Sequence, residues 1–296
     1  MAISRRGRAW RRRAGAAVAA SALAGALFAL APGSGPPTFH PSAAEASGSW
    51  PIRLKVEGPV PLLGAEALSV ARLEAITRRY LGKPYRLDPL GEAQPPDSDP
   101  IYRRDVVDCQ TFVEQTMAEA LAPTEEWVRP LVVLLRYHDG EVRFDRRRHY
   151  CLPEWLDGGW PVRDVTPAIG GRHTRPLQGI IRRDRFLLRR GCPEPVAQQY
   201  GPLVVRMRYL PSEQVGGLEG LLPAGTIAVL ILRARQGFAG HMGWLFRRGK
   251  RAILRHASQR HGRVVDEGLV RYLASTRRFR GIVLLAPDLG RWSAGG

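Results

Sequence analysis

One cysteine in this sequence stands where a nucleophile would. Cys109 follows Asp108 and opens the segment 109–121, in which apolar residues recur at helical spacing. The start of a helix presents free backbone N–H groups and positive potential, which favour a thiolate and lower the pKa of a thiol. The position alone suits a catalytic thiol and a buried, unreactive cysteine about equally well.

Two of the seven histidines can supply the imidazole that a nucleophilic cysteine needs. His241 and His256 each lie at or near one end of an expected strand, and a tight turn at 248–250 joins the two strands. Adjacent antiparallel strands would bring the two side chains together. One imidazole can then accept the thiol proton while the other orients it, as in a triad of nucleophile, base and orienting residue. The alternative is that both are ordinary hydrogen-bonded histidines.

The same side chains must also be weighed as metal ligands. His256 with His261, or His241 with His256, would supply two nitrogen ligands for zinc. However, the sequence has no H-E-x-x-H and no C-x-x-C motif, so we expect no metal and no other cofactor. It also lacks the G-x-S-x-G elbow of serine hydrolases and the P-loop of nucleotide-binding proteins. A cysteine nucleophile fits the residues best.

Helices in the first half of the chain and strands in the last quarter would position these residues. Helical spacing or capping residues predict helices over 69–81, 109–121, 124–136 and 267–275. Pro130 should kink or divide the third of them. Apolar runs or alternation predict strands over 205–209, 225–232, 241–246, 252–257 and 281–286, while 145–202 show no sustained period. Helices followed by a meander of strands are typical of an α+β fold with one antiparallel sheet.

The first 46 residues are typical of a signal peptide and leader. Six arginines between positions 5 and 13 precede an uncharged, Ala- and Leu-rich run at 14–31, and Ala44-Glu45-Ala46 is a small-x-small cleavage site. The alternative is an N-terminal membrane anchor, because a run of about 18 residues is at the short limit for spanning. Sec and twin-arginine export both stay open. Residues 47–66 are rich in Pro and Gly and would link this leader to a folded domain over 67–290.

The chain of 296 residues has 45 Lys and Arg against 27 Asp and Glu, a net charge of +18. Six arginines and one glutamate would leave with the leader, so the remainder keeps +13. A basic exported protein can meet nucleic acid, anionic lipid or anionic wall polymer. The arginines are scattered and no nucleic-acid-binding module is present, so we expect no nucleic-acid partner. We also expect a monomer with no stable membrane insertion once the leader is cleaved.

Eight short segments carry a more specific pattern than any single motif. In chain order they are YLGKPY (80–85), DCQTFVEQ (108–115), LLRYHDG (134–140), HYCLPEWL (149–156), LPAG (222–225), HMGWLF (241–246), LRHAS (254–258) and RGIVLL (280–285). Across residues 75–286 their order and spacing resemble the papain-like cell-wall cysteine hydrolases of the NlpC superfamily, and most of all its N-acetylmuramoyl-L-alanine amidase-like branch. The resemblance implies a papain-like α+β domain, in which the helix carrying the catalytic cysteine packs on a central antiparallel sheet carrying the histidines.

The resemblance also implies a role for each matching residue. Cys109 would be the nucleophile, His241 the general base and His256 the orienting residue. Asp108 would help to hold the substrate, and Tyr85 would place its hydroxyl near the oxyanion. If so, the sulfur of Cys109 and a ring nitrogen of His241 should lie within about 4 Å of each other, with His256 on the far side of His241.

Other matching positions would shape the cleft. In this branch His149 and Tyr150 would line it. The sequence departs from the pattern at Gln110, where relatives usually have a small residue, and at Thr226, where they usually have Asp. Residues 170–202 match poorly, so their role stays open.

The function implied is that of an exported, periplasmic or secreted, cysteine amidase acting on peptidoglycan or on muropeptide fragments. The expected bond joins N-acetylmuramic acid to L-Ala. The alternatives are a γ-D-glutamyl endopeptidase of the same fold and a non-catalytic wall-binding module. A binding module has no need of Cys109, His241 and His256 together, which favours an enzyme.

Three cysteines in an oxidising compartment leave at least one without an intramolecular partner. If Cys109 must stay free to act, Cys151 and Cys192 are the pair available for a disulfide. That bond would close about 40 residues and stabilise the fold by a few kcal/mol. The alternative is two free thiols, because Cys151 belongs to a segment that lines the cleft in relatives.

Overall fold

The computed structural model describes residues 40–41, 54–56, 61–64, 68–233 and 239–292. Nearly all of the expected leader, and most of the expected linker, lie outside the described residues. The described part of these segments includes two short strands, β1 (His40–Pro41) and β2 (Leu54–Lys55). They form a small antiparallel sheet with β3 (Glu141–Val142). None of the helices in the described ranges is long and apolar enough to cross a membrane.

A large antiparallel sheet organises the described residues. Its seven principal strands lie in the order β10-β9-β8-β7-β11-β6-β5, and a short eighth strand, β4, pairs with β11. Their bounds are β4 (Val162–Asp164), β5 (Arg175–Ile181), β6 (Leu203–Pro211), β7 (Ile227–Leu232), β8 (Ala239–Arg248), β9 (Arg251–Ser258), β10 (Arg263–Gly268) and β11 (Phe279–Pro287). The prediction of an α+β fold with one large antiparallel sheet is confirmed.

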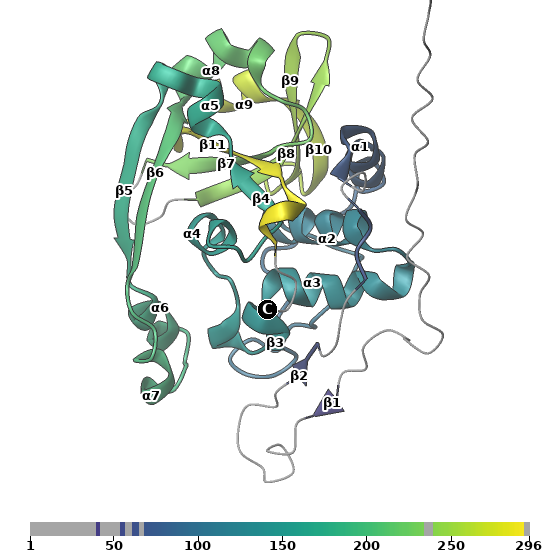
Figure 1. Ribbon diagram of the computed structural model, residues 1–296, viewed down its shortest axis with the longest axis vertical. Coiled ribbons are helices and arrows are strands. Elements are labelled where there is room, and N and C mark those ends of the chain that lie inside the picture. Colours follow the sequence, from purple (N-terminus) through teal and green to yellow (C-terminus); the bar gives the residue numbers. More distant parts are fainter. Residues whose placement is uncertain (1–39, 42–53, 57–60, 65–67, 234–238, 293–296) are drawn as a thin grey trace, which may run out of the picture. The chain divides into compact units, whose positions relative to one another are not determined.

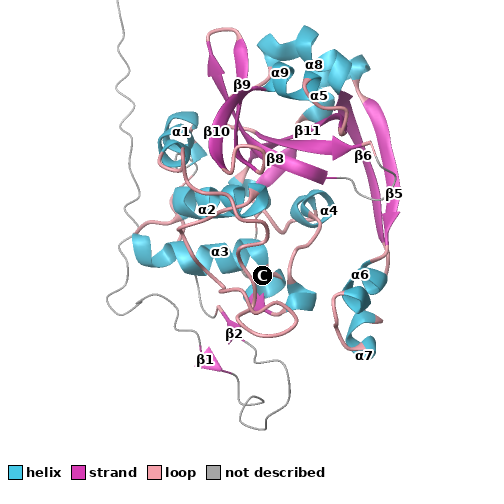
Figure 2. Cartoon of the chain, turned by 180° about the vertical axis from the view of Figure 1, so that it is seen from behind, coloured by secondary structure: helices cyan, strands magenta, loops and turns pink. Residues whose placement is uncertain are grey.

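Helices cover both faces of the central strands (Figures 1 and 2). Within the described ranges they are α1 (Val70–Arg78), α2 (Cys109–Leu121), α3 (Val128–Arg136), α4 (Cys151–Leu156), α5 (Thr166–Gly170), α6 (Arg183–Arg189), α7 (Glu194–Ala197), α8 (Ser212–Leu218) and α9 (Leu269–Ala274). Helices α2 and α3 lie on one side of the sheet, and α5, α8 and α9 lie on the other.

The apolar run that becomes β7 shows why the sheet needs two helical layers. Ile227, Val229 and Ile231 belong to the core that contains α2, whereas Ala228 and Leu230 belong to the core that contains α8 and α9. A strand buried on both faces reads as a continuous apolar run instead of an alternation. The strand predicted over 225–232 is therefore confirmed.

Two expectations for local structure were wrong. Pro130 does not divide a helix, because α3 begins at Val128 after a separate 3₁₀ turn at Glu125–Trp127. Pro130 therefore lies in the first turn of α3, where backbone N–H groups have no partner within the helix. The helix expected from Glu267 begins two residues later, and Glu267 itself belongs to β10.

The segment without a sustained period, 145–202, folds into short elements that include α4, α5 and the strand β5. Strands β5 and β6 form a hairpin that extends away from the central strands and carries α6 and α7 at its far end (Figure 1). This extension, residues 175–211, is called the arm below. Residues of β5 and α6 in the arm line one pocket together with Cys109 and His241.

Candidate active site

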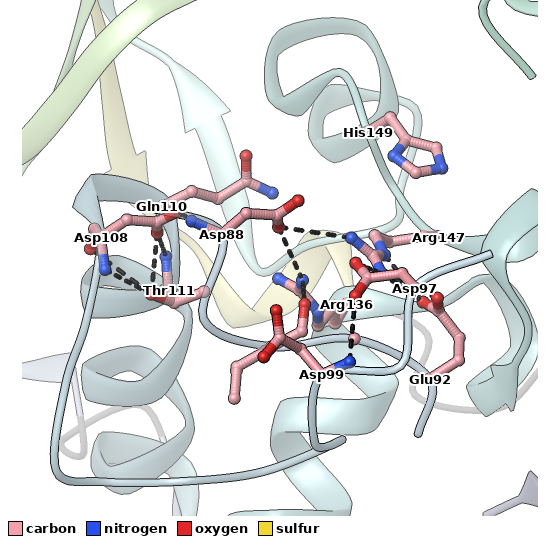
Figure 3. A network of polar contacts seen from close by, with 12 residues as sticks. Asp88, Glu92, Asp97, Asp99, Asp108, Gln110, Thr111, Arg136, Arg147 and His149 are labelled. Carbon is pink, nitrogen blue, oxygen red and sulfur yellow. Dashed lines mark hydrogen bonds and ion pairs between the residues drawn. The ribbon is translucent and has the colours of Figure 1, made fainter. Parts of the chain in front are cut away.

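The start of α2 is fixed by a reciprocal cap. The Thr111 N–H donates to Asp108 Oδ1 at 2.7 Å, while the Asp108 N–H donates to Thr111 Oγ1 at 2.9 Å (Figure 3). Two backbone donors at the helix start are thereby satisfied, and Cys109 becomes the first helical residue. The second oxygen of Asp108 accepts the N–H of Asp88 at 3.1 Å. The structure thus engages both oxygens of Asp108 with the protein itself, and a substrate-holding role for it stays a prediction.

Helix α2 is docked on the strand that carries His241. The buried indole N–H of Trp244, on β8, donates to Thr116 Oγ1 on α2 at 2.8 Å. The thiol of Cys109 reaches the same strand, because the backbone N–H of Met242 is one of its hydrogen-bond partners. Cys109, His241 and Met242 line one pocket of about 640 Å³.

The chemical state of Cys109 differs from the one expected. Backbone N–H groups of Cys109, Gln110 and Met242 do favour the thiolate, as a helix N-terminus should. Burial of the thiol and the negative charge of Asp108 outweigh them and raise the pKa of Cys109 to about 12. The expectation of a lowered thiol pKa was therefore wrong, and the resting side chain is a neutral thiol.

The two histidines meet as the strand pattern predicted. His241 Nε2 lies 2.6 Å from His256 Nδ1, with the rings nearly perpendicular. Gly243 permits this approach, since a Cβ there would lie 2.8 Å from the Cβ of His256. The hydrogen bonds of Cys109 and His241 go to Met242 and to His256, so the direct contact between thiol and imidazole stays a prediction.

A carboxylate that sequence reasoning missed completes the chain of hydrogen bonds. Glu267 Oε2 lies 3.0 Å from His256 Nε2, whose side chain is fully buried. Burial lowers the pKa of both His241 and His256, so both rings are neutral near pH 7. A carboxylate only accepts, so His256 donates from Nε2 and accepts at Nδ1 from His241 Nε2. This leaves His241 Nδ1 unprotonated, which is the state a general base requires.

The sequence did not indicate a role for Glu267, because residues 267–275 were expected to form a helix. The turn at Gly262, followed by Val264 and Val265, was the available signal for a further strand. In the structure Val265 is the cross-strand partner of His256 in the β9–β10 pair, two residues before Glu267. A third strand beside the two that carry the histidines would have placed this acid at the site.

Two tyrosines flank the thiol and the imidazoles. Burial, together with the negative charge of Asp108, raises the pKa of Tyr85 to about 12, so its hydroxyl stays a hydrogen-bond donor near the thiol. Tyr272, which sequence reasoning did not single out, packs against His256 at a ring-centroid distance of 5.0 Å and against His241 at 5.8 Å. These contacts restrict the orientation of both imidazoles.

His149 and Tyr150 line the same pocket as Cys109 and His241. His149 Nε2 donates to the Phe144 carbonyl at 2.7 Å, and its ring packs between Phe144 and Phe186. Burial holds the pKa of His149 well below its usual value, so this ring is neutral. The structure therefore gives His149 the part of a fixed wall residue and leaves its second nitrogen as an acceptor.

The two departures from the family pattern differ in their placement. Gln110 lines the pocket, where its amide donates to Glu114 at 2.8 Å. Thr226 is buried and bonds to the Pro223 carbonyl at 2.8 Å, so it closes a turn before β7. Gln110 is the departure that can alter the pocket.

A buried network of charges supports the start of α2 (Figure 3). Arg136, on α3, donates to Glu114 on α2 at 2.7 Å and to the carbonyl of Leu90 at 2.6 Å. Arg147 binds Glu92 through two nitrogens at 2.8 and 2.7 Å. Pairing of this kind offsets the cost of burying the charges. The network ties the loop that precedes Cys109 to two helices.

The cysteines form no disulfide in the structure. All three cysteines are free, so the disulfide between Cys151 and Cys192 is absent. The two lie in different hydrophobic clusters, Cys151 with α2 and Cys192 with the tip of the arm.

Among the described residues no group of three or more His, Cys, Asp or Glu side chains could hold a metal ion.

Known proteins resemble this chain in sequence pattern and fold. A protein-family model described as N-acetylmuramoyl-L-alanine amidase-like matches residues 75–282. A crystal structure of an N-acetylmuramoyl-L-alanine amidase from Bacteroides uniformis has 25% identity and a TM-score of 0.61, over 73% of this chain and 98% of that one. A Legionella pneumophila protein shares the fold at 20% identity and a TM-score of 0.65, over 74% of this chain and 89% of that one. No curated protein matches the sequence.

Proposed function

The chain belongs to the N-acetylmuramoyl-L-alanine amidase-like family, and from this premise we propose that it is an exported cysteine amidase that cleaves peptidoglycan stem amides. The observation that carries the proposal is that His241, which lines the same pocket as Cys109, begins a hydrogen-bonded series with His256 and Glu267. A wall-binding module has no use for a base whose free nitrogen is fixed in this way.

The proposed arrangement is papain-like. The helix that begins with Cys109 packs on the strand that carries His241, and the next strand carries His256. In the first step the sulfur of Cys109 attacks the amide carbonyl while His241 Nδ1 accepts the thiol proton. Because the thiol is neutral at rest, proton transfer accompanies attack instead of preceding it. Backbone N–H groups at the start of α2, with the hydroxyl of Tyr85, would stabilise the oxyanion.

The second step releases the amine. The imidazolium of His241 donates the proton to the leaving nitrogen, the C–N bond breaks, and an acyl-enzyme remains on Cys109. Water then attacks this thioester with His241 as the base, and the carboxylic acid leaves. His256 would stabilise the charged His241 ring, and Glu267 would stabilise His256.

The proposed bond joins N-acetylmuramic acid to L-Ala. The family description and the Bacteroides uniformis amidase support this choice. The experiment is liquid chromatography and mass spectrometry of purified muropeptides after digestion, with Cys109→Ala as the control. The proposal expects intact stem peptides with a free N-terminal L-Ala, together with peptide-free sugar. Cleavage after γ-D-Glu would make the protein an endopeptidase, and binding without any product would make it a wall-binding module.

A further inference from the structure

The pocket that holds Cys109 is strongly cationic. Its lining contains Arg182, Arg185 and Arg189 from the arm and Arg278 just before β11, and none of its described lining residues is Asp or Glu. Arg278 lies near the catalytic end, because its charge helps to lower the pKa of His241. A pocket with four arginines and no balancing carboxylate in its described lining favours an anionic ligand.

Two of the pocket arginines of the arm, Arg185 and Arg189, share one face of α6, and Arg182 is the residue just before this helix. Positions 185 and 189 are separated by four residues, so their side chains leave the helix on the same side. Arg183 and Arg190 leave from another side, and Arg190 lies over the ring of Phe186. Arg185 and Arg189 therefore line the pocket, whereas Arg183 and Arg190 do not.

Two of the three pocket arginines are available to a ligand. Arg182 is balanced by Asp184, with nitrogen–oxygen distances of 3.0 and 2.5 Å. Arg185 and Arg189 are exposed and have no carboxylate at ion-pair distance among the residues described here. The charge of Arg189 acts on Tyr150, which lines the same pocket. The unbalanced charge is thus directed at the pocket that contains the nucleophile.

We propose that Arg185 and Arg189 form a carboxylate-binding subsite that selects stem peptides bearing free carboxylates over amidated ones. The inference rests on the proposed function, because it assumes that the peptide part of the substrate extends from Cys109 toward the arm. A guanidinium group binds a carboxylate through two parallel N–H···O hydrogen bonds, which a neutral carboxamide cannot reproduce. Ile180 and Ile181, beside these arginines, would contact the apolar parts of the peptide.

Binding to an inactive variant tests the subsite without any turnover. Isothermal titration calorimetry of Cys109→Ala would compare N-acetylmuramoyl-L-Ala-D-Glu with the same molecule amidated at both carboxyl groups. The free acid should bind at least about fivefold more tightly, as expected from losing a partly exposed charge-assisted hydrogen bond. Adding Arg185→Gln and Arg189→Gln should remove the difference. Adding Arg190→Gln, which removes a charge from the same helix but not from the pocket, should preserve it.

The other outcomes overturn the subsite and leave the proposed function to a separate measurement. Equal binding of the acid and the amide would show that the arginines of the arm do not distinguish a carboxylate from a carboxamide. A preference that survives Arg185→Gln with Arg189→Gln would place its source elsewhere. If neither molecule binds Cys109→Ala, the subsite is refuted. Turnover of natural muropeptides by the wild-type protein then decides on its own whether the amidase proposal also falls.

Discussion

At the residue scale, the account depends on which nitrogen of His241 carries a proton. Glu267 decides this through His256, so Glu267→Gln should disturb the base without touching the substrate. We expect kcat/KM to fall by about tenfold to a hundredfold, as for other changes behind a functional histidine. Glu213→Gln, an exposed carboxylate on α8, is the matched control and should have no effect.

The pH profile separates this positioning role from a merely structural one. The negative charge of Glu267 raises the pKa of His256 against the effect of burial. Its removal should lower that pKa further and, through the hydrogen bond between the two rings, should also lower the pKa of His241. The acidic limb of kcat/KM, which follows protonation of His241, should therefore move to lower pH in Glu267→Gln. An unchanged limb with unchanged kcat would contradict the role given to Glu267.

Because Cys109 and His241 are both neutral at rest, we expect a particular dependence of activity on pH. The pKa of His241 lies well below 6.5 and the pKa of Cys109 is raised to about 12, so neither group titrates near pH 7. Activity should stay level from pH 9 down through pH 6.5 and fall only when His241 becomes protonated below that. Alkylation of Cys109 by iodoacetamide should be slow at pH 7 and accelerate toward alkaline pH. Rapid alkylation that is independent of pH above 5 would instead indicate a preformed thiolate.

The two histidines should differ when each is removed. His241→Ala removes the proton acceptor and should abolish turnover, whereas His256→Ala removes orientation and should leave measurable activity. Single-turnover kinetics on muropeptides gives both rates. A complete loss in His256→Ala with a fully folded protein would assign His256 a direct chemical step.

The sequence singled out three candidate side chains, and the structure places Cys109 and His241 in one pocket with His256 against His241, but their state was not predicted. The types and spacing of Cys109, His241 and His256 depend on local patterns, which are visible in one chain. The pKa of Cys109 and the partnership of Glu267 depend on burial and on a third strand, which local patterns do not show. The direction of the thiol pKa was wrong for this reason.

At the element scale, the placement of α2 depends on the ion pair that joins it to α3. Arg136 and Glu114 are both buried, so Arg136→Met would leave a carboxylate buried without its partner. Such changes cost about 3–5 kcal/mol of unfolding free energy. Urea denaturation should show that loss, while Arg78→Met, at an exposed pair with Glu74, should change stability by less than about 1 kcal/mol. Equal effects of the two variants would contradict the supporting role of the network.

The length of a helix or strand decides whether the sequence alone reveals it. The strand over 225–232 and the helix over 109–121 are long enough for their apolar periods to be read directly. In 145–202 the elements include α5, with five residues, and α7, with four, and such short segments are stabilised by tertiary contacts more than by their own pattern. The part of the arm before β6 was therefore not predicted, although it lines the candidate site, whereas the strand expected over 205–209 is confirmed as β6.

At the scale of the whole molecule, the family match and the net charge of +18 are consistent with a basic protein acting at the cell wall. The expected signal predicts cleavage after Ala46, so that the mature protein begins at Ser47. Mass spectrometry of the exported protein should find that terminus. Cleavage there would remove β1 and leave β2 paired with β3. An uncleaved chain recovered in the membrane fraction would instead support an N-terminal anchor.

The central claim is that the thiol of Cys109 performs the hydrolysis, and one measurement tests it most directly. Turnover of purified muropeptides by wild-type protein and by Cys109→Ala should be compared at equal concentration, with folding of both checked by circular dichroism. The account predicts product with the wild type and none above the enzyme-free background with Cys109→Ala, because no other group can form the acyl-enzyme. Equal product from both proteins would contradict it.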